Sequence, residues 1–135
     1  MPIELSELME FASGRKPAIR VGDLPRPVAE LLRCHPAIVW LGIQTFYKIA
    51  KKHPEIAVAE FQQLYFLIAN GTYHRDPARP NCVSVHSPMV DEALYTTALK
   101  VADRGCEVWV STFHRTNDKQ IIRRSNGWEL VHPRP

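Results

Sequence analysis

The sequence predicts an α+β fold, in which helices come first and a four-stranded antiparallel sheet follows. Apolar residues recur at helical spacing up to residue 70, whereas short alternating runs separated by turn residues dominate from residue 72 onward. Helices and strands that are segregated along a chain are typical of α+β domains. With 135 residues, the chain is long enough to form a single domain, 1–135, with a buried core.

Four helices are predicted before residue 71. They cover residues 3–12, 28–33, 44–52 and 58–70. Each has apolar residues three or four positions apart, as one buried helix face requires. Pro27 lies in the first turn of the second helix, and Pro54 ends the third because the residue before a proline is displaced from helical geometry. Asn70-Gly71 is expected to close the fourth helix as a C-cap.

Strands are predicted from runs of β-branched and aromatic residues. Two lie among the helices, at 18–21 and 37–41, and four follow in succession, at 72–75, 82–86, 93–101 and 107–113. These last four form the predicted antiparallel sheet, with Arg104-Gly105 as the hairpin turn between the third and the fourth. A basic helix at 119–124 and a final strand at 128–131 complete the chain.

The composition is that of an ordinary soluble domain, with 45% hydrophobic and 23% charged residues. Glu4, Glu7 and Glu10 lie where a signal peptide would have a basic start, and no apolar run is long enough to span a membrane. Reduced thiols are expected because the cysteines are far apart and form no CxxC pair. They are Cys34, Cys82 and Cys106. We therefore expect a cytoplasmic protein.

A polar cluster stands at the end of the predicted strand 107–113. Ser111, Thr112, His114 and Arg115 bring hydroxyl, imidazole and guanidinium groups to one short stretch, and a basic helix follows. A strand that ends in polar groups before a basic helix is a common way to build an anion site. The alternative is an ordinary strand, turn and solvated helix. The net charge of +3 does not by itself indicate a nucleic-acid binder.

Metal-independent RNA cleavage is the chemistry that these residue types fit best. It needs one group to take the proton of the 2′-OH, another to protonate the 5′-oxygen, and cations to stabilise the phosphorane. His53, Lys100, His114 and Arg115 supply these groups, with Ser111 and Thr112 as hydroxyl donors. No HxxxH, HxH or GxGxxG pattern is present, so no metal or cofactor is expected. The alternatives are a helix cap for His53 and a strand-edge charge for Lys100.

Several segments resemble a known family. They are KIAKKHPEI (48–56), the NG after the longest helix, the strand through Lys100, and VWVSTFHRTNDKQIIRR (108–124). Together they resemble the phage-associated branch of the barnase, EndoU, colicin and RelE-like nucleases. The resemblance implies a barnase/RelE-like domain with a core at 36–132, which leaves residues 1–35 as a candidate N-terminal extension. It also implies a metal-independent ribonuclease that acts as a toxin or in phage–host conflict.

The resemblance carries catalytic roles onto His53, Lys100, Ser111 and Arg115, with His114 in the same motif. It implies RNA as the substrate and, for a toxin, an immunity or antitoxin protein as a partner. The residues expected to bind substrate are Thr112, Thr116, Lys119 and Arg123.

Two alternatives stay open. One is a non-catalytic RNA- or protein-binding module of the same fold, since this superfamily varies its catalytic residues. The other is a small interaction protein, such as a phage-encoded inhibitor of a host protein. The second alternative predicts an exposed apolar patch on the first helix. The patch would consist of Leu5, Leu8, Met9 and Phe11.

Overall fold

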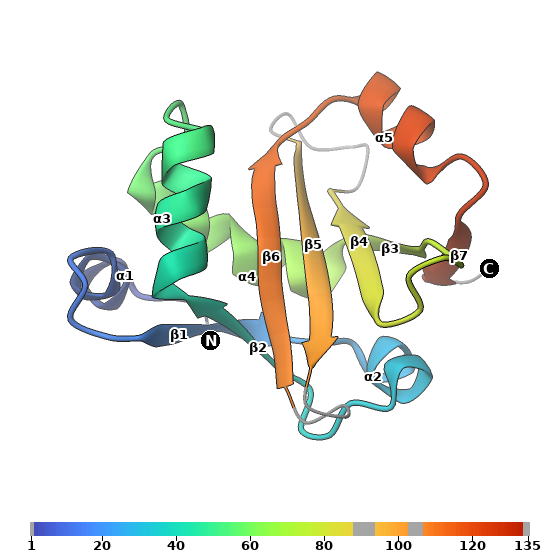
Figure 1. Ribbon diagram of the computed structural model, residues 1–135, viewed down its shortest axis with the longest axis horizontal. Coiled ribbons are helices and arrows are strands. Elements are labelled where there is room, and N and C mark those ends of the chain that lie inside the picture. Colours follow the sequence, from blue (N-terminus) through green and yellow to red (C-terminus); the bar gives the residue numbers. More distant parts are fainter. Residues whose placement is uncertain (1, 88–93, 103–106, 134–135) are drawn as a thin grey trace.

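A computed structural model describes residues 2–87, 94–102 and 107–133, and shows an α+β fold built on one seven-stranded mixed sheet (Figure 1). The strand order is β1-β2-β6-β5-β4-β3-β7. Its strands are β1 (Ala18–Asp23), β2 (Ile38–Gly42), β3 (Thr72–Arg75), β4 (Cys82–His86), β5 (Tyr95–Ala102), β6 (Glu107–Arg115) and β7 (Glu129–His132). The helices are α1 (Leu5–Ala12), α2 (Arg26–Leu32), α3 (Ile43–Lys52), the 3₁₀ helix η1 (Val58–Gln62), α4 (Gln63–Asn70) and α5 (Asp118–Ser125).

The α+β class is confirmed, but the four-stranded, barnase/RelE-like antiparallel sheet is wrong. The four predicted strands pair as expected, and the sheet then extends on both sides, through β1 and β2 beyond β6 and through β7 beyond β3. The β2–β6 pair is parallel, with Val39 opposite Val108 and Trp40 opposite Trp109. No turn residues in the sequence predict this pair, because its two strands are far apart along the chain. Burial explains it, since Val39 and Leu41 of β2 are both fully buried.

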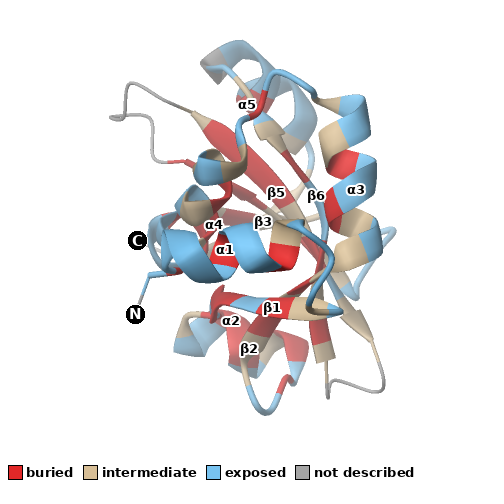
Figure 2. Ribbon diagram, turned by 90° about the vertical axis from the view of Figure 1, so that its left-hand side faces the viewer, coloured by how far each residue is buried: buried red, intermediate tan, exposed pale blue. Residues whose placement is uncertain are grey.

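One hydrophobic core joins the N-terminal segment to the rest of the chain. A line of aromatic rings runs from α1 to the sheet, with centroid separations of 5.4 Å for Phe11–Phe46, 4.9 Å for Phe46–Phe61 and 5.2 Å for Phe61–Phe113. In Figure 2 the buried faces of α1 and β1 lie against this same core. The described residues before residue 36 thus share one core with those that follow, and the Phe46 contacts hold α3 beside the sheet.

The exposed apolar patch predicted for α1 is wrong. Leu8 and Phe11 are fully buried, and only Leu5 and Met9 are exposed, at 47% and 53%. The apolar residues of this helix therefore divide between the core and the solvent, and the covered face is the one that packs against η1 and α3. Among the described residues, no helix is both long and apolar enough to cross a membrane.

Three local predictions need correction. The helix predicted at 58–70 is divided into η1 and α4. Gly71 is not a left-handed C-cap, because its φ is −71°. Glycine is needed there for space, since a Cβ would lie 2.5 Å from both the Leu67 carbonyl oxygen and Val85 Cγ1.

Strand β6 continues two residues beyond the predicted end, to Arg115. The predicted hairpin turn at Arg104-Gly105 lies outside the described residues, as does Cys106.

Candidate functional site

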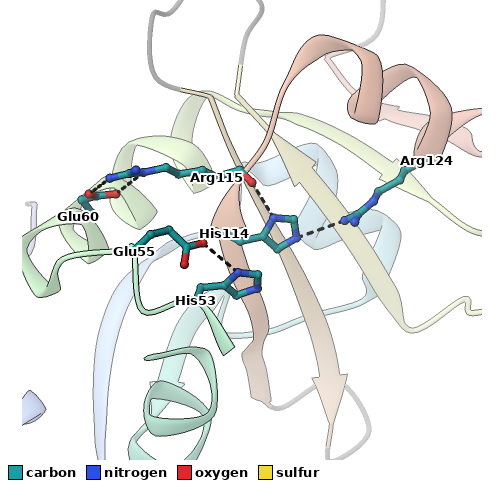
Figure 3. A network of polar contacts seen from close by, with 6 residues as sticks. All are labelled: His53, Glu55, Glu60, His114, Arg115 and Arg124. Atoms are coloured by element: carbon teal, nitrogen blue, oxygen red, sulfur yellow. Dashed lines mark hydrogen bonds and ion pairs between the residues drawn. The ribbon is translucent and has the colours of Figure 1, made fainter. Parts of the chain in front are cut away.

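The site lies where the C-terminal end of α3 meets the C-terminal end of β6. Strand β2 pairs with β6 at Val108 and Trp109 only, and the chain then turns at Gly42 into α3. Helix α3 runs beside the remaining part of β6 (Figure 1). This arrangement brings His53, at the end of α3, against His114 of β6. The two rings stack with a centroid separation of 5.0 Å and an interplanar angle of 26° (Figure 3).

A β-bulge in β6 decides which way His114 points. Opposite β5, Ala98 pairs with Thr112 and the next residue, Leu99, pairs with Val110, so Ser111 is the extra residue. On a regular strand His114 would share the buried face with Val110. The extra residue reverses the alternation, so that Phe113 is buried and His114 lies on the open face. Arg115, as the next residue, points to the opposite side from His114.

The hydrogen bonds of His114 select one neutral form of its ring. Nδ1 lies 2.9 Å from the carbonyl oxygen of Arg115, and Nε2 lies 3.2 Å from Nη1 of Arg124 (Figure 3). A carbonyl can only accept and a guanidinium can only donate, so the proton belongs on Nδ1 and the lone pair on Nε2. Burial lowers the pKa of His114, and the positive charges of Arg124, His53 and Lys52 lower it further, against the opposing effect of the carbonyl. His114 is therefore a neutral imidazole near pH 7.

His53 has a carboxylate partner. Its Nδ1 lies 3.3 Å from Oε1 of Glu55, which follows two residues later in the turn after α3. Because the carboxylate accepts the hydrogen bond, Nδ1 is the donor and Nε2 is left for other partners. The two histidines of the stack are thus held differently, His53 by a carboxylate and His114 by a carbonyl and a guanidinium.

Arg115 forms an ion pair with Glu60 of η1. Its Nε lies 3.0 Å from Oε2, and a second, shorter contact joins Nη2 to Oε1. The hydroxyl of Tyr95 also donates to Glu60 Oε2, at 3.1 Å. The hydrogen bond from Arg115 is the main cause that lowers the pKa of Glu60. The guanidinium of Arg115 thus connects η1 to β6 at the rim of the site, facing away from the two imidazoles (Figure 3).

The hydroxyl groups at the bulge interact with the backbone of β5. Ser111 Oγ donates to the carbonyl oxygen of Ala98 at 3.1 Å, whereas Thr112 Oγ1 accepts from the Ala98 amide at 3.2 Å. Ser111 has therefore used its only proton, while Thr112 keeps a proton that it can donate to a ligand. Of the two, Thr112 is the better hydrogen-bond donor for an anion.

A groove of about 990 Å³ contains the histidine stack. Five of the predicted site residues line it, namely His53, Ser111, Thr112, His114 and Arg115. The remaining four, which are Lys100, Thr116, Lys119 and Arg123, do not. The charged lining residues that the sequence analysis missed are Lys48, Lys51, Lys52, Glu55 and Arg124. The lining lysines come from α3 on one side, Arg124 comes from α5 on the other, and Arg115 comes from β6.

Whether Arg123 or Arg124 faces the groove depends on which side of α5 is buried. This helix has two adjacent isoleucines, and the sequence does not say which one is buried. The structure buries Ile121 and leaves Ile122 62% exposed. Arg124 lies three residues after Ile121 and so on its side of the helix, where it reaches His114. Neighbouring residues of a helix point about 100° apart. Two adjacent isoleucines therefore leave the direction of the buried face uncertain by that angle.

A third histidine, His86 of β4, continues the polar row beyond His114. Thr96 of β5 is opposite both His86 and His114 in the sheet, and its Oγ1 lies 2.9 Å from His86 Nδ1. Burial, followed by the charges of His74, Arg124 and His114, lowers the pKa of His86 to about 4. The sequence predicted a strand at this position but not the burial of His86, because a buried polar side chain has no signature of its own.

No protein-family model, no curated protein and no solved structure matches this chain. The resemblance to the barnase, EndoU, colicin and RelE-like nucleases therefore stays a prediction drawn from short motifs. Among the described residues, no group of three or more histidine, cysteine, aspartate or glutamate side chains is arranged to hold a metal ion.

Proposed function

We propose that the protein is a metal-independent endoribonuclease that cleaves RNA through attack of the 2′-OH on the adjacent phosphate. The observation that carries this proposal is the pair of stacked imidazoles, 5.0 Å apart, in a groove with lysines on one side and an arginine on the other. Two imidazoles supply both proton transfers of this reaction, and fixed cations supply the charge stabilisation.

In this mechanism His114 is the general base. Its neutral ring already presents the Nε2 lone pair, which Arg124 holds in the free protein. A bound phosphate competes for Arg124, and this leaves Nε2 free to take the proton of the 2′-OH. The 2′-oxygen then forms a bond to phosphorus as the bond from phosphorus to the 5′-oxygen breaks. His53 protonates the departing 5′-oxygen, and the products are a 2′,3′-cyclic phosphate and a free 5′-OH.

The phosphate charge is stabilised by Arg124 and Lys52, with a hydrogen bond from Thr112. Lys52 is close enough to His114 to lower its pKa, and Arg124 contacts the ring directly. These residues take the role that the sequence analysis gave to Lys100 and Arg115. Arg115 is bound to Glu60, and Lys100 lies outside the groove.

Cleavage of total RNA in excess EDTA tests this proposal. The variants are His53→Ala, His114→Ala and Arg124→Ala, with His35→Ala as a matched control because His35 is exposed and lies outside the groove. Wild type and the control are expected to cleave in EDTA, and each groove variant to lose at least about a hundredfold in rate. Loss of wild-type cleavage in EDTA, or full activity of both histidine variants, would overturn the proposal.

A substrate with sulfur in place of the 5′-oxygen separates the two histidine roles. A thiolate leaves without protonation, so this substrate needs the base but not the acid. Cleavage by His53→Ala is expected to recover, whereas His114→Ala stays inactive. Recovery of His114→Ala alone would reverse the assignment of acid and base.

We infer a cytoplasmic, toxin-like role in phage–host conflict, in which an immunity or antitoxin protein covers the groove. The basic lining of the groove favours an acidic partner surface. The non-catalytic alternative, a module that holds RNA or protein without cutting, predicts RNA binding without any cleavage by folded wild type in the assay above.

A further inference from the structure

The open face of the sheet carries a second group of side chains, some distance from the histidine stack. In register across four strands, Arg20 of β1 is opposite Trp40 of β2, Trp40 is opposite Trp109 of β6, and Trp109 is opposite Lys100 of β5. Both tryptophans are partly exposed, and Arg20 and Lys100 are exposed. We call these four residues the tryptophan row.

The tryptophan row lies on the same face of the sheet as His114. Thr96 is opposite His114, and Lys100 lies four residues further along β5 and so on the same side, about 13 Å away at strand spacing. The side chains of Ala98, Thr112 and Ser111 lie between His114 and Trp109 along these two strands, and all three are at least partly exposed. In Figure 1, α4 crosses behind β5 and β6, while α3 and α5 lie at the sides. Ser111 and Thr112 line the groove, and with Ala98 they form a row of partly or fully exposed side chains that leads toward the tryptophans.

The ring of Trp109 is held in place. Its Nε1 donates to Glu107 Oε2 at 2.8 Å, and its Cζ3 lies 3.6 Å from where a Cβ on Gly42 would be. An indole that is fixed at its polar end can accept a stacked ring with little loss of conformational entropy. Partly exposed aromatic rings beside cations are how proteins hold single-stranded nucleic acids, because every nucleobase has a face that can stack.

We propose that the tryptophan row is the binding site for the nucleobases of a single strand that continues from the groove. Bases stack on Trp40 and Trp109, and Lys100 contacts the backbone phosphates. Arg20 adds a second cation, although it also forms an ion pair with Asp23 at 2.6 Å. This inference rests on the proposed function, because the strand is the substrate whose scissile phosphate lies at His53 and His114. In this inference Lys100, which lies outside the groove, contacts the same RNA strand as the groove residues do.

Binding of a fluorescently labelled 2′-deoxy oligonucleotide of about eight nucleotides tests the tryptophan row directly. Without a 2′-OH this probe cannot be cleaved by the proposed mechanism. Trp40→Ala, Trp109→Ala and Lys100→Ala are each expected to weaken binding, the tryptophan variants by at least about fivefold. Trp128→Ala is the matched control, since Trp128 is also partly exposed but precedes β7, at the far edge of the sheet. Lys100→Ala keeps the test valid if a tryptophan variant fails to fold.

Two outcomes would overturn this inference. One is wild-type affinity in Trp109→Ala and Lys100→Ala, and the other is no binding of the probe by wild type. A failure of the catalytic proposal looks different, because probe binding would then still depend on the tryptophan row while no RNA is cleaved. If both proposals hold, the tryptophan variants lose more cleavage rate on a strand of about eight nucleotides than on a dinucleotide, which is too short to reach the row.

Discussion

Acidification is expected to destabilise the fold through His86. This side chain is only 2% exposed, and its Nε2 has no hydrogen-bond partner among the described residues. The groups that face it are the guanidinium of Arg124 in α5 and two further imidazoles, His74 of β3 and His114 of β6, which gain positive charge on acidification. Burial and these charges make the imidazolium unfavourable in the folded protein. The pKa of His86 therefore falls from 6.5 to about 4 on folding.

The sign and size of the effect follow from proton linkage. As the pH falls, the unfolded chain binds a proton at this position before the folded protein does, so the free energy of unfolding decreases between about pH 6.5 and about pH 4. Each tenfold difference in proton affinity corresponds to about 1.4 kcal/mol. Between about pH 7 and about pH 4.5, His86 alone is therefore expected to cost about 2 kcal/mol.

Urea unfolding of wild type and His86→Asn at these two pH values measures this contribution. Asparagine keeps a hydrogen-bonding group near the position of Nδ1, and hence a partner for Thr96, but it cannot be protonated. Acid-sensitive groups that do not interact with His86 affect both proteins alike. The loss of stability on acidification should be about 2 kcal/mol smaller in the variant. An equal loss in both proteins would refute the reasoning.

Two further predictions concern the fold and the site. Gly71→Ala should cost about 3 kcal/mol and lower the Tm by about 12 °C, because the new Cβ would overlap the Leu67 carbonyl and Val85. Gly127→Ala, with open space but a φ of +81°, should cost only about 1 kcal/mol, and equal Tm values would contradict this. Arg124→Gln should raise the pKa of His114 by removing a positive charge beside it, which an NMR titration of the imidazole detects. An unchanged or lower pKa would show that Arg124 does not hold the ring neutral.

Local patterns in the sequence predicted where the strands lie, but they did not predict how all of the strands pair in the sheet. β3 and β4 lie where their alternating residues indicated, at Thr72–Arg75 and Cys82–His86. Pairing between distant segments was not predictable in the same way. The parallel contact of β2 with β6 depends on burying Val39 against the shared core, and no residue near Val39 encodes its partner. For the same reason, the number of strands in the sheet could not be predicted from local patterns.

The sequence identified the histidines of the site but not the way they are held. His53 and His114 were singled out by residue type and position, and the structure brings them into contact. The direction of His114 depends on the bulge at Ser111, which has no glycine to mark it. Arg115 was the obvious cation of the motif, yet Glu60 binds it from a segment 55 residues earlier in the chain. Interactions of this kind follow from the tertiary fold and leave no local pattern.

The most direct test of the central claim is whether cleavage needs the 2′-OH. A short RNA and the same strand with a single 2′-deoxy sugar at the mapped cleavage position are incubated with wild type in EDTA, and the product ends are analysed. The mechanism predicts a 2′,3′-cyclic phosphate from the RNA and no cut at the 2′-deoxy position. Cleavage at the 2′-deoxy position would contradict the account, because the base assigned to His114 would then have no proton to remove.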